Sequence, residues 1–139
     1  MGFFGKIFRK KQTQGSLVCD VCNFRISSPE GHLLTTTEVV SSPEYWRRYY
    51  EAHKSDFIVF KIYSYEGFCH DPIMGTSCVK TVASQTKPWL VCENCITLFN
   101  VDLEKTQKYA KQWWQSNGTF KPPGTGPAPL SIVKMVNEQ

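Results

Sequence analysis

The spacing of hydrophobic positions changes along the chain, and these changes separate predicted strands from predicted helices. Apolar and β-branched residues predict short strands at 31–40, 57–63 and 89–91, with Thr81 and Val82 as a further pairing segment. The stretch FIVFKIY at 57–63 has the strongest strand pattern in the chain. Residues 17–26 predict two short strands joined by a cysteine turn, and the Gly and Pro content of 67–81 predicts a loop.

Two segments carry the start and stop signals of helices. In the first, at 41–53, Ser42 is an N-cap residue and Pro43 suits the first helical position. The aromatic residues that follow lie on one face: Tyr45, Trp46, Tyr49 and Tyr50. We expect this face to cover the sheet, with a ligand or partner surface as the alternative.

The second helix signal follows a predicted helical turn at 96–99. Asp102 predicts the cap of a helix at 103–115, and Gly118 predicts its stop. Trp113 and Trp114 are neighbours on this helix and point about 100° apart, so one of the two rings is a candidate for an interface.

The flanking segments differ in composition from the centre, which predicts a domain at 16–118 between two tails. Residues 119–139 form a Pro/Gly-rich tail. Residues 1–15 place Phe3, Phe4, Ile7 and Phe8 on one helical face beside basic residues. This tail predicts weak, reversible contact with an anionic membrane. Docking on the protein's own body and disorder in solution are the alternatives.

The formal charge of +4 comes from the tail, where four basic residues precede the first acidic residue, Asp20. The other 12 basic residues match 12 acidic ones, so the body is neutral. Broad binding to a phosphate backbone depends on clustered Lys and Arg, which makes nucleic acid the less favoured partner. No apolar run approaches the roughly 20 residues that a membrane-spanning helix needs.

Four of the six cysteines lie in two matching sequences, LVCDVC at 17–22 and LVCENC at 90–95. Structural Zn²⁺ takes four tetrahedral ligands and favours thiolates at this spacing. The expected ligands are Cys19, Cys22, Cys92 and Cys95. Because residues 23–91 lie between the pairs, the metal would fasten the two ends of a long inserted body.

Disulfides, a redox pair and plain buried thiols are the alternatives for these cysteines. Disulfides need an oxidising compartment, and the apolar residues near the N-terminus are interrupted by Gly5 and Lys6 instead of forming a signal peptide. We therefore expect a cytoplasmic protein, with a peripheral membrane location if the tail binds lipid. One redox pair is conceivable, whereas two are harder to explain.

Two stretches resemble treble-clef zinc fingers, in which a cysteine knuckle and hairpin come first and the second ligand pair opens a helix. CDVCNFRI at 19–26 matches the knuckle, and LVCENCITLF at 90–99 matches the strand-to-helix pair. The long insertion departs from the compact form of that class. Together with the pattern of elements, the resemblance implies an α+β fold, a small antiparallel sheet with two or three helices, tied by a zinc site of four cysteines.

A second candidate site lies in CHDPIMGTSC, where Cys69, His70 and Cys78 are close in sequence. These residues suit a second metal site or a Cys-His nucleophilic pair, with His32 or His53 as another base. A surface loop with two ordinary cysteines is the alternative, because the sequence shows no proximity between thiol and base.

The sequence contains no phosphate loop, HExxH or GxSxG motif. We therefore expect an adaptor or accessory subunit that acts through an unidentified protein partner, rather than an enzyme. The alternatives are a nucleic-acid-binding zinc module and a cysteine-dependent enzyme that uses Cys69 or Cys78.

Overall fold

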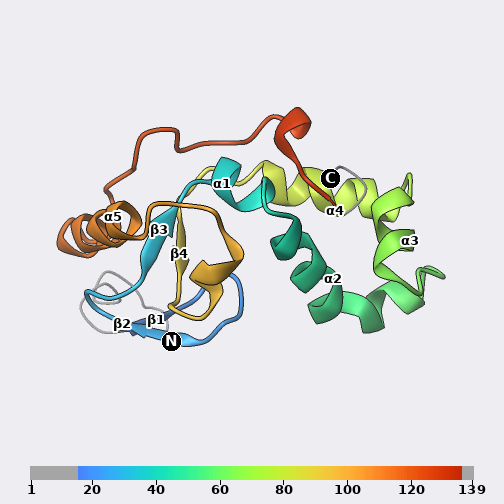
Figure 1. The fold of residues 1–139 in the computed structure, drawn as a ribbon, viewed down its shortest axis with the longest axis horizontal. Helices are drawn as coiled ribbons and strands as arrows, with labels where there is room; N and C mark the ends of the chain where they lie inside the picture. Colours follow the sequence, from blue (N-terminus) through green and yellow to red (C-terminus); the bar gives the residue numbers. More distant parts are fainter. Residues whose placement is uncertain (1–15, 136–139) are drawn as a thin grey trace. The chain divides into compact units, whose positions relative to one another are not determined.

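The computed structural model describes residues 16–135, and its fold is α+β, as the sequence predicts (Figure 1). Two two-stranded antiparallel sheets and five α-helices make up this part of the chain. The elements, in order, are β1 (Ser16–Val18), β2 (Arg25–Ser27), β3 (His32–Leu34), α1 (Thr36–Val40), α2 (Pro43–Ile58), α3 (Tyr65–His70), α4 (Met74–Ala83), β4 (Trp89–Val91), the 3-10 turn η2 (Cys95–Leu98), α5 (Leu103–Gln115) and the 3-10 turn η3 (Leu130–Ile132).

The described chain divides into two compact units. Unit 1 contains the residues up to Thr35, Lys87–Thr97 and Val101–Thr125. Unit 2 contains Thr36–Thr86, Leu98–Asn100 and the residues from Gly126 onward. The predicted domain boundaries, at 15/16 and 118/119, stay predictions. The tail at 1–15, with its expected membrane contact, lies outside the described residues.

Unit 1 contains both sheets and α5. Strand β1 pairs with β2, and β3 pairs with β4, so that His32 lies opposite Val91 and Leu33 opposite Leu90. Helix α5 packs on β3. Figure 1 shows β3 and β4 beside this helix.

The ends of α5 follow the predicted signals. The Asp102 side chain accepts a hydrogen bond from the backbone N–H of Lys105 at 3.2 Å. At the other end the Gly118 N–H donates to the Trp113 carbonyl at 2.8 Å. Asn117 takes the first left-handed conformation, with φ of 57°. This pattern satisfies the last carbonyls of the helix, so the stop involves Asn117 as well as Gly118.

Unit 2 is helical, and its core contains the aromatic face of α2. Ser42 caps α2 by accepting the N–H of Tyr45, and Pro43 is the first helical residue, as predicted. Trp46 is fully buried and donates from its indole N–H to the Val40 carbonyl at 3.0 Å. Burial of the aromatic face is therefore confirmed. The face packs on other helices instead of on a sheet, and one of its contacts is Phe68 of α3.

Three strand predictions were wrong, one of them in part. Only His32–Leu34 of the segment 31–40 is a strand, and α1 follows it directly. The segment 57–63 completes α2 and then turns: the N–H of Ile62 bonds back to the Phe57 carbonyl at 3.1 Å. Lys61 has a left-handed φ of 64°, which ends the helix. The pairing segment at Thr81 and Val82 lies inside α4 instead of in a sheet.

The predicted loop at 67–81 contains most of α3 and α4. Ser64 caps α3 by accepting the N–H of Gly67 at 3.0 Å. The Asp71 carboxylate accepts the N–H groups of Ile73 and Gly75 as the chain enters α4. Pro72 lies between the two helices, where it interrupts neither.

No helix in the described part of the chain has the length and hydropathy that crossing a bilayer requires.

Candidate metal centre

The first cysteine pair lies in the turn between β1 and β2. The N–H of Cys19 bonds to the Phe24 carbonyl at 2.7 Å, and the N–H of Asn23 bonds to the Cys19 carbonyl at 2.9 Å. Asn23 takes a left-handed φ of 66°, which Asn tolerates better than most residues. The turn therefore closes tightly and holds Cys19 and Cys22 on the same side. We call residues 19–22 the first knuckle.

The second pair begins where β4 ends. Cys92 follows the last residue of the strand, and Cys95 opens the 3-10 turn η2. The N–H of Ile96 bonds to the Cys92 carbonyl at 3.0 Å, which closes this turn. We call residues 92–95 the second knuckle.

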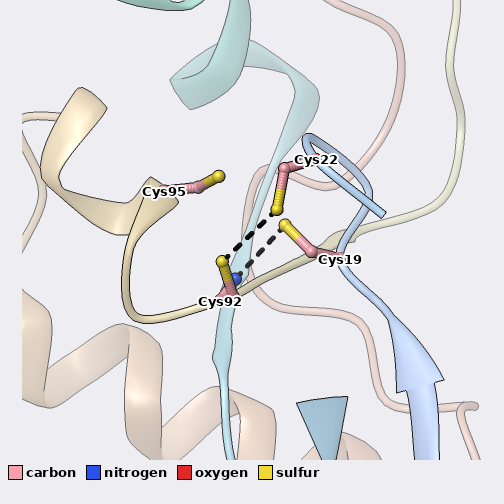
Figure 2. Close-up of side chains that lie close together, drawn as sticks. All are labelled: Cys19, Cys22, Cys92 and Cys95. Atoms are coloured by element: carbon pink, nitrogen blue, oxygen red, sulfur yellow. Dashed lines mark hydrogen bonds between the residues drawn. The ribbon is translucent and has the colours of Figure 1, made fainter. Parts of the chain in front are cut away.

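The four thiols of the knuckles converge, as Figure 2 shows. All four sulfur atoms lie within 4.8 Å of one another, and the Sγ atoms of Cys22 and Cys92 are 3.7 Å apart. A tetrahedral site with Zn–S bonds of about 2.3 Å has sulfur–sulfur edges of about 3.8 Å. Cys19, Cys92 and Cys95 are buried and Cys22 is partly exposed. The arrangement has the ligands and the size for one metal ion.

Backbone N–H groups point at the sulfur of Cys19. Those of Val21 and Cys92 lie 3.3 and 3.4 Å from its Sγ. Burial nevertheless raises the pKa of Cys19, although these N–H groups oppose the rise. Burial, hydrogen bonding with Cys22 and the charge of Cys19 also raise the pKa of Cys95.

Cys22 has the opposite shift. Burial acts to raise its pKa, but the backbone N–H of Phe24 and hydrogen bonds from the neighbouring thiols outweigh it and lower the pKa. Without a metal, the four-cysteine group therefore favours ionisation of one thiol and opposes ionisation of several thiols at once. A bound dication supplies the positive charge that lets all four thiols ionise together.

The acidic residue inside each knuckle ties it to the sheet of β3 and β4, a role that our sequence reasoning missed. Asp20 accepts the N–H of Leu90 on its carboxylate at 2.8 Å and donates its own N–H to the Leu90 carbonyl at 2.9 Å. Glu93 contacts the imidazole of His32, a residue of β3, at 2.9 Å. The repeated acid in LVCDVC and LVCENC was the available signal.

Cys69, His70 and Cys78 do not form a second metal-ligating group in the described part of the chain. Within residues 16–135, the only group of at least three potential metal-ligating side chains is the four-cysteine group. Cys69 and His70 lie at the end of α3, and Cys78 lies in α4. Burial and hydrogen bonding with Cys78 raise the pKa of Tyr49.

The two histidines proposed as bases for this site have other contacts. His32 is buried in unit 1 against Glu93 and Thr106. The ring of His53, on α2, packs on that of Tyr49 with centroids 4.5 Å apart.

We expect Cys69→Ser and Cys78→Ser to leave metal content unchanged and to alter the free energy of unfolding by less than about 1.5 kcal/mol, because both residues are only partly buried. Metal analysis and urea unfolding of the two variants check this. Loss of half the metal in either variant would assign its thiol to the coordination shell.

No protein-family model, curated protein or solved structure matches the chain.

Proposed function

We propose that the protein is an adaptor or accessory subunit whose unit 1 is held together by a structural zinc ion. The observation that carries the zinc assignment is the convergence of Cys19, Cys22, Cys92 and Cys95. Thiolates select soft or borderline metals, and a set of four cysteines suits Zn²⁺. Four protein ligands complete the tetrahedron, which leaves no open position for a catalytic water. The ion then joins β1 and β2 to the end of β4.

The order of elements supports a treble-clef-like site. A hairpin contains the first knuckle, and the second knuckle lies between a strand and a helical turn. The inserted residues between the knuckles include β3 and most of unit 2, so the site fastens both ends of a long excursion of the chain.

The case for an interaction role comes from unit 2, where the turn after α2 exposes a run of large apolar side chains. Ile58, Val59 and Phe60 are 53%, 77% and 54% exposed, and Tyr63 is 71% exposed. Contiguous exposed apolar residues of this kind are typical of interaction sites. We assign the exposed side chains of Ile58, Val59, Phe60 and Tyr63 as the contact surface for a protein partner.

Metal analysis tests the zinc assignment directly. We expect protein prepared under reducing conditions to contain about one zinc ion per chain, and Co²⁺ substitution to give the intense absorption of tetrahedral thiolate coordination. Folded, reduced protein without a stoichiometric metal would contradict the proposal.

Site-specific photo-crosslinking tests the partner surface. A photoreactive residue in place of Val59, with the exposed Gln107 as a matched position on α5, is introduced into the chain in its native cell. We expect a discrete crosslinked protein from position 59 that position 107 does not give. Identical products from both positions, or crosslinks to nucleic acid instead, would contradict the adaptor role.

A further inference from the structure

We infer that His32 is a positioning residue of the metal centre, because it joins the second knuckle to α5 through Glu93 and Thr106. The inference rests on the proposed zinc site and adds that zinc retention depends on how α5 is held.

The three side chains form a continuous hydrogen-bonded bridge within unit 1. His32 Nε2 lies 2.9 Å from Glu93 Oε2, and His32 Nδ1 lies 2.9 Å from Thr106 Oγ1. An ionised carboxylate can only accept, so Nε2 donates to Glu93. His32 is 2% exposed and Thr106 is 3% exposed, so the centre of the bridge is shielded from water.

Strand pairing explains why the imidazole lies beside the knuckle. His32 of β3 is the partner of Val91, the last residue of β4, and Cys92 follows Val91 directly. Glu93 is the next residue, between the two cysteines of the second knuckle. A hydrogen bond on Glu93 therefore fixes the segment that places Cys92 and Cys95.

The other end of the bridge is fixed by α5. Thr106 lies in the first turns of α5, and its hydroxyl also lies 3.1 Å from the Leu103 carbonyl. Helix α5 packs on β3, the strand that contains His32. The exposed carboxylate of Glu93 contributes little through charge alone, since water screens it. Its effect is positional: the buried ring sets where the knuckle can lie.

Outer residues that orient metal ligands typically change metal affinity by 10-fold to 100-fold when they are replaced. Thr106→Val keeps the shape of the side chain and removes the hydroxyl, which leaves Nδ1 of a buried ring without its partner. We expect zinc transfer to a coloured chelator to be about 10-fold faster from this variant than from the parent protein. Thr106→Ser keeps a hydroxyl, and we expect it to restore slow release.

Trp114→Phe is the matched control for a general weakening of α5. Its indole N–H donates to the Glu30 carbonyl at 2.8 Å, so the change removes a different hydrogen bond of the same helix and touches neither knuckle. We expect Trp114→Phe to lower the thermal midpoint of unfolding without faster zinc release.

The other end of the bridge is tested at Glu93. Glu93→Ala should release zinc faster than the parent protein. Glu93→Gln keeps an acceptor oxygen and should release zinc more slowly than Glu93→Ala.

One outcome would overturn the role of the bridge and leave the zinc assignment intact. In that outcome the parent protein holds zinc, and Thr106→Val and Glu93→Ala release zinc at the same rate as the parent. Equal acceleration in Trp114→Phe and Thr106→Val would also overturn it, because any loosening of α5 would then suffice. Absence of zinc from the parent protein would instead contradict the proposed function itself.

Discussion

Removal of zinc with a strong chelator under reducing conditions is expected to unfold unit 1. Structural zinc in small modules contributes apparent binding free energies of about 10–16 kcal/mol at neutral pH. Whole domains are stable by only about 5–15 kcal/mol. The two sheets of unit 1 are two-stranded, and their strands have three residues each. Pairs this small are marginal without further support.

Hydrogen exchange read by mass spectrometry separates the units in this experiment. Amides of β3, β4 and α5 should lose protection when the metal is removed and regain it when zinc is returned. Cys92→Ser should have the same effect without chelator, and Cys69→Ser is its control, since that thiol lies outside the group. Protection of unit 1 that survives complete metal removal would show that the zinc is dispensable.

The four-cysteine group was predictable because its signal is local. Each CxxC turn presents its two thiols through the backbone of a few residues, and the matching sequences indicated that both turns serve one site. The helix ends at Ser42 and Asp102 were predictable for the same reason, since an N-cap acts on an N–H three residues away. Local chemistry of this kind leaves a pattern in the sequence.

The segment 57–63 misled the prediction because its hydrophobicity does not follow burial. Phe57 and Ile62 face the core, but Ile58, Val59 and Phe60 are exposed. A dense apolar run indicates a buried strand only when the surroundings cover it. Here α2 continues into the run and a left-handed residue, Lys61, turns the chain.

The His32 bridge was beyond the reach of sequence patterns. Its partners are separated from it by 61 and 74 positions, and neither belongs to a motif with His32. Only the pairing of β3 with β4 and the packing of α5 bring the three side chains together. The sequence offered His32 as a candidate base, whereas the structure gives it two fixed partners.

Trp46→Ala is expected to destabilise unit 2 by about 3–5 kcal/mol, the usual range for removing a large buried aromatic side chain. The indole is fully buried, and its N–H bonds to the Val40 carbonyl. The change therefore opens a cavity among the helices and removes one of the two N–H groups that donate to that carbonyl, the other being the backbone N–H of Lys134. Trp46→Phe keeps most of the apolar volume and should cost less.

The zinc content of Trp46→Ala shows whether the two units unfold separately or together. Trp46 belongs to unit 2, and all four cysteine ligands belong to unit 1. If each unit has its own core, Trp46→Ala should lower hydrogen-exchange protection in α2 and α3 while the protein keeps its metal and its protection in α5. Loss of zinc together with unit 2 would mean that the two units unfold as one cooperative block, so that the inserted residues stabilise the knuckles as much as the metal stabilises them.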